Sequence, residues 1–355
     1  MRLREAGLED GPMLCEFFRQ TPMEAGTAVV LDRGPEFFAL LKLKGLAKTF
    51  LLFDGDRLTG TATALWHSAR DGGREVTVGE VLDLRVAEPA RGGRASWQLL
   101  GAVREAFDQA GVDWISCLIM SDNHMAAQLV NGRAGLPRLE PLARYASVHY
   151  LSWRAPMRAT ADWTITRASP AAGPALAGLF GPAHRASRFA PSESVCWPDP
   201  ASRSSAWLAI DGGGRPLGAL LLWDGDKVRR IRIARYRVSD APLRLLARAA
   251  EAVGAAVALP APGEVLRTWA SRGFVLAHPE PTLTRALLGA ALREAVDSGR
   301  HVVQINLEQS DPLLPLLPRY PRSTYWTTLY CAPYPSKAGA AEPHPSPYYA
   351  DIALA

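Results

Sequence analysis

One segment of the chain has residue types suited to holding a phosphate group. An apolar strand pattern from Glu80 to Val86 is followed by a loop of small and basic residues, Arg91-Gly92-Gly93-Arg94-Ala95-Ser96, at which a helix begins. The first turn of a helix presents backbone N–H groups at the positive end of the dipole, and glycines let a phosphate approach that backbone closely. The two arginines add charge-assisted contacts. The loop is therefore predicted to bind a phosphate or pyrophosphate.

Other well-known motifs do not account for this loop. It lacks the Gly-Lys-Ser/Thr ending of a Walker loop and the Gly-x-Gly-x-x-Gly spacing of a dinucleotide-binding loop. The sequence also has no Gly-x-Ser-x-Gly elbow, which argues against a serine hydrolase.

The cysteines and histidines give no sign of a metal site. The four cysteines are far apart in the sequence: Cys15, Cys117, Cys196 and Cys331. This spacing argues against a disulfide framework or a zinc site, so no metal is expected. We interpret Cys117 as a packed thiol on an apolar strand. His67, His149 and His301 are interpreted as ordinary polar residues.

The elements that position the loop belong to an internal repeat. Each copy opens with a short strand and a helix. Apolar runs then flank a turn, Asp54-Gly55-Asp56 in the first copy and Asp211-Gly212-Gly213-Gly214 in the second, which predicts a hairpin. An amphipathic helix follows in each copy and ends at a glycine, Gly111 or Gly299. The order β-α-β-β-β-α-β-α-β is predicted twice.

The end of each copy follows the same pattern. The apolar strands Trp114–Met120 and His301–Leu307 are each followed by a helix opened by Asp122 or Asp311 and by a final strand, Ala146–Trp153 or Thr324–Cys331. In the second copy, Ser239 to about Pro281 is predicted to insert a further helix, Leu243–Val253, between the fourth strand and its helix. The predicted fold class is α/β, of the α+β type, with a mixed, mainly antiparallel sheet flanked by helices in each copy.

The loop and its surroundings resemble the GNAT superfamily of acyl-CoA-dependent N-acyltransferases. That family has a strand, a proline and then Arg/Gln-x-x-Gly-x-Gly/Ala at the start of its main helix. Val86, Pro89, Arg91-Gly92 and Leu99-Leu100 occur at the corresponding spacings. Asn123 and Ala126 match an Asn-x-x-Ala of the family after the next strand. In element order the resemblance covers both halves of the chain, and the whole is similar to a tandem GNAT protein.

The chain departs from the family pattern at several positions. Arg94 stands where the first motif glycine is expected, and Ser96 where the last Gly or Ala is expected. Val130 replaces a tyrosine that acts in the family as general acid toward the leaving thiolate. The segment of the second copy aligned with the loop is His278-Pro279-Glu280-Pro281-Thr282-Leu283, which has no glycine and whose prolines lack N–H donors. We interpret the second copy as degenerate.

The resemblance implies roles for individual residues. Acetyl-CoA or another acyl-CoA would be the acyl donor. Its binding residues would be Leu84, Arg85, Val86, Arg91, Gly92, Gly93, Arg94, Ala95, Ser96 and Asn123. Glu80 lies where family members often place a catalytic base. The alternative interpretation is that Glu80 only ends the strand at a solvent-exposed edge. Asp83 is a second catalytic candidate, and the alternative is a buried carboxylate paired with an arginine such as Arg85. Tyr145 or His124 would replace the missing tyrosine.

The resulting prediction is an N-acyltransferase that moves an acetyl or other acyl group from CoA to an amine in a ternary complex. A carboxylate base would deprotonate the amine, so no covalent intermediate is needed. The amine would belong to a small molecule or peptide bound in the cleft between the domains. The alternative is a non-catalytic acyl-CoA sensor, or a pseudoenzyme whose basic run Arg229–Arg237 contacts a partner.

Length and composition fit two globular domains. The 355 residues are 48% hydrophobic with a net charge of +5. We place an N-terminal domain with the acyl-CoA loop at 1–153, a degenerate domain at 163–332 and a disordered tail at 333–355. The small basic excess suits a phosphate-bearing ligand, and aromatic residues are too few to indicate nucleic-acid binding. Without a long apolar stretch or signal-peptide core, a cytoplasmic protein away from membranes is expected, and a homodimer is compatible with the sequence.

Overall fold

A computed structural model describes residues 1–23, 27–91, 94–121, 123, 126, 130–132, 135–155, 162–191, 205–226, 228–334 and 348–350. The elements of the first copy are β1 (Arg2–Glu5), α1 (Gly11–Gln20), β2 (Ala28–Asp32), α2 (Ala39–Lys44), β3 (Leu46–Asp54), β4 (Arg57–Asp71), β5 (Arg74–Val86), α3 (Ala95–Ala110), β6 (Trp114–Met120) and β7 (Glu140–Leu151). The predicted hairpin and glycine-capped helix of this copy are confirmed as β3–β4 and α3.

The second copy contains the remaining helices and strands. They are β8 (Trp163–Arg167), α5 (Gly173–Ala186), β9 (Ala190–Pro191), β10 (Ser205–Asp211), β11 (Pro216–Asp224), β12 (Arg230–Arg235), α6 (Ala241–Ala252), β13 (Val265–Leu266), β14 (Thr268–Leu276), α7 (Pro281–Asp297), β15 (Val302–Glu308) and β16 (Arg322–Pro333). No helix within this described part of the chain is long and apolar enough to cross a bilayer.

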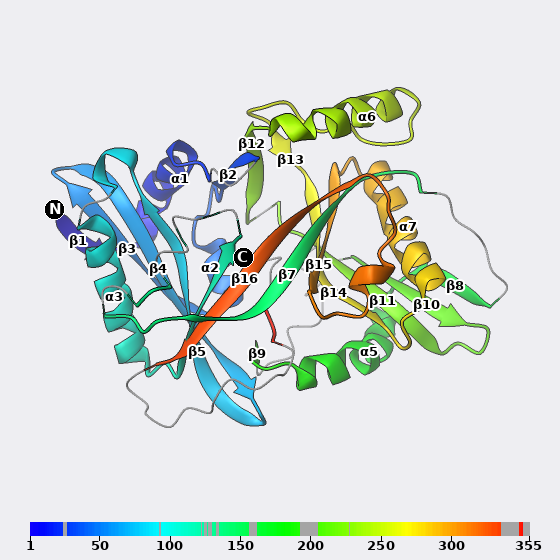
Figure 1. Ribbon diagram of the computed structural model, residues 1–355, viewed down its shortest axis with the longest axis horizontal. Coiled ribbons are helices and arrows are strands. Elements are labelled where there is room, and N and C mark those ends of the chain that lie inside the picture. Colours follow the sequence, from blue (N-terminus) through cyan, green and yellow to red (C-terminus); the bar gives the residue numbers. More distant parts are fainter. Residues whose placement is uncertain are drawn as a thin grey trace.

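A single mixed sheet of 13 strands runs through both copies (Figure 1). Its order is β1-β3-β4-β5-β6-β16-β7-β15-β14-β11-β10-β8, with β9 paired to β4. Alternate residues of the strands point to opposite faces, so each half has two apolar layers. In the second half, α7 packs with Leu220 and Leu222, while α5 packs with Ala219 and Leu221. The predicted fold class, a mixed sheet flanked by helices, is confirmed.

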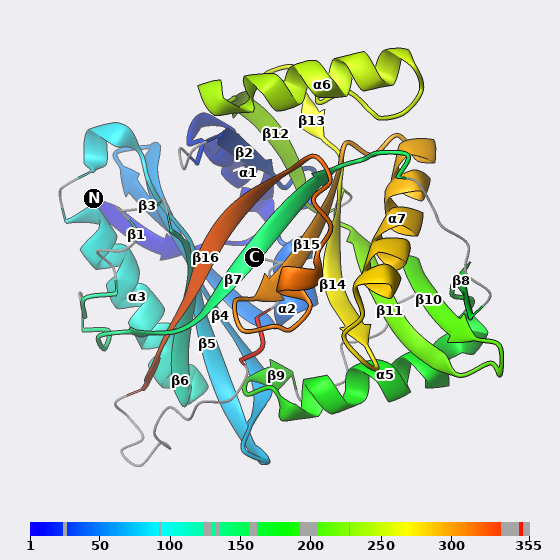
Figure 2. The ribbon, with the colours of Figure 1, turned by 45° about the vertical axis from the view of Figure 1, so that its right-hand side comes forward.

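The two copies exchange their last strands. The first copy's β7 pairs antiparallel with β15 of the second copy. The second copy's β16 lies between β6 and β7 and pairs with both. Figure 2 shows β7 and β16 side by side where they cross from one half to the other. The sheet is thus continuous across the two copies, and the domain limits 1–153 and 163–332 remain a prediction.

Two predicted details of the second copy are wrong. Asp311 does not open an α-helix: its carboxylate accepts from Leu313 N–H, but only a single 3₁₀ turn, Leu314–Leu316, follows. Pro315 and Pro318 lack the N–H donors that a longer helix would need. The inserted helix is present as α6. It lies before the fourth strand of this copy and not after it, because the strand that pairs with β11 is β14 and not the basic strand β12. The corresponding helix predicted at Asp122 falls largely outside the described residues.

Parts of the predicted disordered tail are packed against the sheet. Tyr334 is buried, with its ring edge-on to Phe107. Tyr348 is also buried, and its carbonyl accepts a hydrogen bond from the Tyr145 hydroxyl. Disorder was therefore the wrong expectation for residues 333, 334 and 348–350, and the rest of the tail lies outside the described residues.

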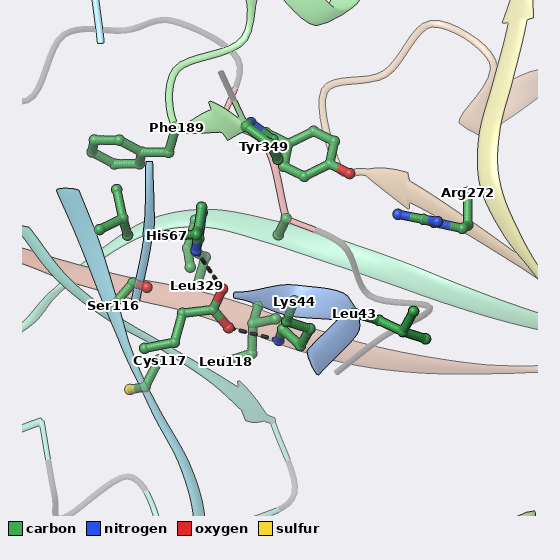
Figure 3. A pocket seen from close by; sticks show the side chains of 14 residues that line it. Leu43, Lys44, His67, Ser116, Cys117, Leu118, Phe189, Arg272, Leu329 and Tyr349 are labelled. Atoms are coloured by element: carbon green, nitrogen blue, oxygen red, sulfur yellow. Dashed lines mark hydrogen bonds and ion pairs between the residues drawn. The ribbon is translucent and has the colours of Figure 1, made fainter. Parts of the chain in front are cut away.

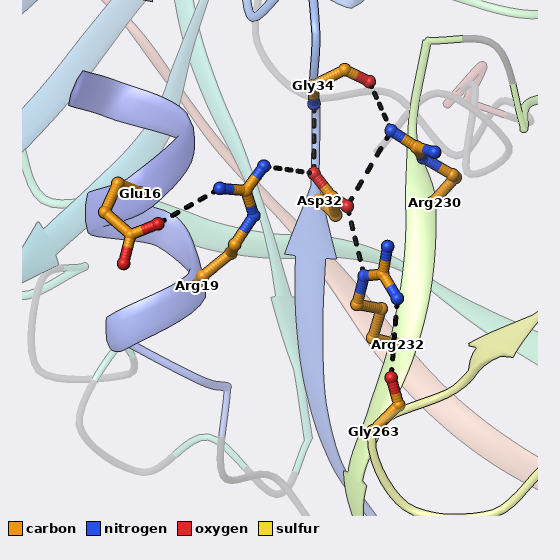
Figure 4. Close-up of polar contacts among 7 residues, drawn as sticks. All are labelled: Glu16, Arg19, Asp32, Gly34, Arg230, Arg232 and Gly263. Atoms are coloured by element: carbon orange, nitrogen blue, oxygen red, sulfur yellow. Dashed lines mark hydrogen bonds and ion pairs between the residues drawn. The ribbon is translucent and has the colours of Figure 1, made fainter. Parts of the chain in front are cut away.

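A buried carboxylate joins the copies at a second, small sheet in which β12 pairs with both β2 and β13. Asp32, at the end of β2, is 1% exposed and faces three guanidinium groups (Figure 4). Its oxygens lie 3.4 Å from Arg19, 3.1 Å from Arg232 and 3.8 Å from Arg230, and one accepts from Gly34 N–H at 3.1 Å. Part of the basic run therefore has a structural partner in the first copy.

Asp32→Asn is expected to lower the free energy of unfolding by about 3 kcal/mol or more, because it leaves partly buried arginines without their anion. Burial alone would raise the pKa of Asp32, but the Gly34 hydrogen bond and the arginines hold it below 3.8. This contribution is therefore present above about pH 3.8 and lost as the pH falls through the lowered pKa. Denaturant unfolding at pH 7 and pH 3 measures it. The exposed pair Arg154–Asp297 gives the control, Asp297→Asn, which should cost less than about 1 kcal/mol. An equal cost of both variants would contradict the prediction.

Candidate active site

The strand that leads to the predicted phosphate loop separates from its neighbour. Strand β5 pairs in parallel with β6 only from Val78 to Glu80, although β5 continues to Val86. A register shift against β4 marks a bulge at Asp83, whose φ of 56° lies in the left-handed region. Beyond Glu80 the edge of β5 therefore has no pairing with β6, and Leu84–Val86 lie along this edge.

Helix α3 begins directly after the loop. Arg94 is its exposed N-cap residue, Ala95 is buried and Ser96 is half-buried. The first N–H groups of a helix have no intrahelical partner, so they are available to an anion. Exposed Arg91 donates from Nε to the Val86 carbonyl at 3.2 Å, which ties the loop to the strand end. Gly92 and Gly93 lie outside the described residues. The helix end with its two arginines therefore has the kinds of groups that bind phosphate.

Close packing fixes this helix against the sheet. A Cβ on Gly79 of β5 would lie 2.9 Å from the ring of Phe107 on α3, so only glycine allows this approach. After β6, Asn123 Oδ1 accepts from Ala126 N–H at 3.1 Å, an N-cap type of contact. Val130, where the resemblance implied a tyrosine, is buried. Asn123 therefore has a visible structural role, and its predicted contact with CoA remains a prediction.

A cavity opens where β5 and β6 separate (Figure 3). It holds about 720 Å³ of space, counting its open mouth. Its walls come from both copies: α2, β4, β5 and β6 from the first, and β14 with Arg272, β16 with Leu329, and the tail residues Tyr349 and Ala350 from the second. This agrees with the expectation of a cleft between the copies.

Three titratable side chains meet at the inner wall of this cavity. Lys44 Nζ donates to Glu80 Oε2 at 2.7 Å, and His67 Nδ1 lies 3.7 Å from Glu80 Oε1. Burial alone would raise the pKa of Glu80, but the Lys44 and His67 charges hold it below 4.5. Burial lowers the pKa of His67 below 6.5, Glu80 opposes this shift, and Lys44 adds to it. At neutral pH the site therefore holds an ionised Glu80 carboxylate in contact with Lys44 and a neutral His67 imidazole.

The β4–β5 hairpin explains why His67 and Glu80 meet. Its two-residue turn, Gly72–Gly73, has positive φ at both positions, as a type I′ turn requires. The resulting register places Leu65 opposite Glu80 and Val78 opposite His67, so the histidine and the glutamate are diagonal neighbours on one face. The Asp71-Gly72-Gly73-Arg74 turn is a sequence signal for this register, although His67 was expected to be an ordinary polar residue.

Lys44 reaches Glu80 from a different element and was also missed. It ends helix α2, and Gly45 follows it. A Cβ on Gly45 would lie 2.4 Å from the Trp66 carbonyl oxygen, so glycine lets the chain pass close to β4. Lys44 is 36 residues from Glu80 in the sequence, and no local pattern predicts this contact.

The structure does not bring the other predicted catalytic residues to the cavity. Asp83 forms two 2.7 Å contacts with buried Arg33, so the alternative of a buried ion pair is the correct one, with Arg33 and not Arg85 as partner. The Arg85 guanidinium lies 4.2 Å from the centre of the Phe18 ring and donates to the Thr21 carbonyl.

Tyr145 is likewise engaged elsewhere. Its hydroxyl donates to the Tyr348 carbonyl at 2.5 Å, and burial raises its pKa, so it is not placed to protonate a thiolate in the cavity. His124 lies outside the described residues. Cys117 lines the cavity, but burial and the Glu80 charge raise its pKa to about 12. It is therefore a protonated thiol and not a nucleophile.

The corresponding site in the second copy differs in two respects. Strand β14 pairs with β15 over Thr268–Ala270, just as β5 pairs with β6 over Val78–Glu80, so Ala270 occupies the position of Glu80. The Glu280 side chain caps α7 by accepting from the N–H groups of Thr282 and Leu283. A carboxylate thus occupies the helix end that a phosphate would need.

Among known proteins, no family model and no curated sequence matches the chain. Solved structures do match. A tandem GNAT protein from the clavulanic acid biosynthesis pathway aligns with a TM-score of 0.58 at 11% identity, over 94% of this chain and 98% of that one. The chain has a tandem GNAT fold. Saccharomyces cerevisiae N-myristoyltransferase with bound myristoyl-CoA aligns with a TM-score of 0.56 at 11% identity, over 95% and 79% of the two chains. An Enterococcus faecalis protein described as a probable N-acyltransferase aligns with a TM-score of 0.52 at 12% identity, over 94% and 72%. The predicted resemblance is confirmed at the level of the fold.

Proposed function

We propose that the protein transfers an acyl group from an acyl-CoA to an amine. The observation that carries this proposal is the position of the cavity at the point where β5 and β6 separate. The cavity contains the Glu80 carboxylate and the His67 imidazole. The two substrates can come into contact there, with the acyl donor bound along the open edge of β5 and the acceptor bound in the cavity. Acyltransferases among the structures of similar fold support the same class of reaction.

The residues of the first copy would hold acetyl-CoA or another acyl-CoA. The N-terminus of α3 with Arg91 and Arg94 suits the phosphates, and the backbone of Leu84–Val86 suits the amide-bearing arm of CoA. The acceptor, a small-molecule or peptide amine, would enter the cavity between the copies. A basic group on the cavity wall would remove its proton as the amine attacks the thioester carbonyl, so the enzyme needs no covalent intermediate.

Calorimetric titration with acetyl-CoA is expected to give one site per chain, because Ala270 and the Glu280 cap distinguish the second copy. Gly92→Pro should abolish this binding by removing an N–H donor and constraining the loop. The matched control is Gly212→Pro, at an exposed turn of the second copy where a Cβ meets nothing within 4 Å. Unchanged affinity in Gly92→Pro would exclude the loop from binding. Intact binding without transfer to any amine would indicate an acyl-CoA sensor.

A further inference from the structure

His67 presents a reactive nitrogen to the cavity. The ring lines the cavity, with its side chain 16% exposed. Nδ1 is buried without a hydrogen bond, and the atom facing it is Glu80 Oε1 at 3.7 Å. Among the described residues, the side-chain atoms that are both buried and without a hydrogen bond do not include His67 Nε2. The neighbouring Glu80 carboxylate therefore favours the tautomer with hydrogen on Nδ1, which leaves the Nε2 lone pair directed to the accessible side of the ring.

Glu80 is poorly suited to accept a proton itself. Its Oε2 is in a 2.7 Å contact with the Lys44 ammonium group, and the Lys44 side chain is only 5% exposed. Protonating the carboxylate would leave that buried cation without its anion, which is costly in a protein interior. An imidazole accepts a proton near neutral pH without breaking the pair, and its new charge would lie next to Glu80.

Resting on the acyl transfer proposed above, we propose that His67 Nε2, and not Glu80, removes the proton from the acceptor. Glu80 is then a positioning residue that orients the ring and stabilises the imidazolium, and Lys44 keeps Glu80 ionised. In this step the acceptor nitrogen forms a bond to the thioester carbonyl carbon and gives its proton to Nε2. The C–S bond breaks, and its electron pair leaves on the CoA sulfur, which solvent protonates. When water is the acceptor, its oxygen forms the bond to the thioester carbonyl carbon in the same way, and the product is the free carboxylic acid.

The groups around the ring set the pH dependence of this step. Burial lowers the pKa of His67, Glu80 on β5 raises it, and Lys44 on α2 lowers it further. Cys117 on β6, Arg272 on β14 and Tyr349 in the tail line the same cavity. Because the pKa of His67 lies below 6.5, the rate should rise as the pH increases through that lowered pKa and stay constant above it. Removing the Glu80 charge removes the contribution that raises the pKa, so the rise should move to lower pH.

The test uses the full chain and saturating acetyl-CoA, with water as acceptor and release of the CoA thiol as readout. His67→Gln should lower the rate at least about 10²-fold and remove the pH-dependent rise. Glu80→Gln should keep a rise, displaced to lower pH. The same titration should appear in the NMR signal of the His67 ring and move in the same direction in Glu80→Gln. The control is His278→Gln, an exposed histidine of the second copy, which should behave as wild type.

The outcomes separate this inference from the proposed function. If wild type binds no acetyl-CoA in calorimetry, or binds it but releases no CoA thiol with water or with any amine as acceptor, the proposed function fails and His67 loses its role with it. If turnover is present and His67→Gln keeps the pH-dependent rise, or Glu80→Gln abolishes it, Glu80 is the base and only the assignment of His67 is overturned. Should His67→Gln not fold, the pH profile of Glu80→Gln decides alone.

Discussion

Glu80→Gln is expected to slow acyl transfer about 10²-fold while acetyl-CoA binds with nearly unchanged affinity. The carboxylate lies on the cavity wall, at the last residue through which β5 pairs with β6. The residues expected to bind CoA lie further along the chain, from Leu84 to the first turn of α3. The substitution therefore changes the reacting end of the site and leaves the phosphate end intact. CoA release and calorimetry on the same preparation measure the two effects.

The same variant also tests stability, because it leaves Lys44 as a buried cation without an anion. We expect a loss of about 3 kcal/mol in the free energy of unfolding. The matched variant Lys44→Met/Glu80→Gln removes both charges and should recover most of that loss without recovering turnover. Recovery of turnover in the double variant would mean that Glu80 serves only the fold. Unchanged turnover in the single variant would remove Glu80 from the mechanism altogether.

Local patterns predicted the parts of the fold that depend on neighbouring residues. The Asp54–Asp56 turn predicted the β3–β4 hairpin, and the apolar periodicity ending at Gly111 predicted α3 with its left-handed cap. The internal repeat predicted two halves of similar architecture, but not β2 and α2 of the first copy or the position of α6 in the second. It did not reveal that β7 and β16 exchange places, because strand pairing between distant segments depends on contacts that no local pattern encodes.

The site was predictable to a similar extent. The loop at the start of α3 and Glu80 follow from a motif contained in a short segment. His67 was accessible in principle, because the Gly72–Gly73 turn sets the register that places it beside Glu80. Lys44, Arg272 and Tyr349 come from three distant segments that only the folded chain brings to one cavity. Asp83 was a catalytic candidate because it lies three residues after Glu80, and its actual partner could not be identified because Arg33 is 50 residues away in the sequence.

Arg33→Met is expected to lower the free energy of unfolding by about 3–5 kcal/mol, because it leaves the Asp83 carboxylate buried without a cation. The two side chains are 5% and 7% exposed and share two 2.7 Å hydrogen bonds. The guanidinium also lies 5.5 Å and 5.0 Å from the ring centres of Phe18 and Phe37. Among the described residues Asp83 has no second ion pair within 4.0 Å, and the Arg85 charge acts on it only without direct contact.

The expected effect extends to acyl-CoA binding. Asp83 sits at the bulge that directs the end of β5, and the backbone from Leu84 to Val86 follows directly. Loss of the ion pair should let this segment move, so acetyl-CoA affinity should fall together with stability. Arg215→Met is the control, because Arg215 pairs with Asp211 in an exposed turn of the second copy with 83% of its side chain exposed. It should cost less than about 1 kcal/mol and leave affinity unchanged. If Arg33→Met lowered the free energy of unfolding no more than this control, the ion pair would not be what holds the bulge in place. The backbone pairing of β4 with β5 alone would then determine the shape of the open edge of β5.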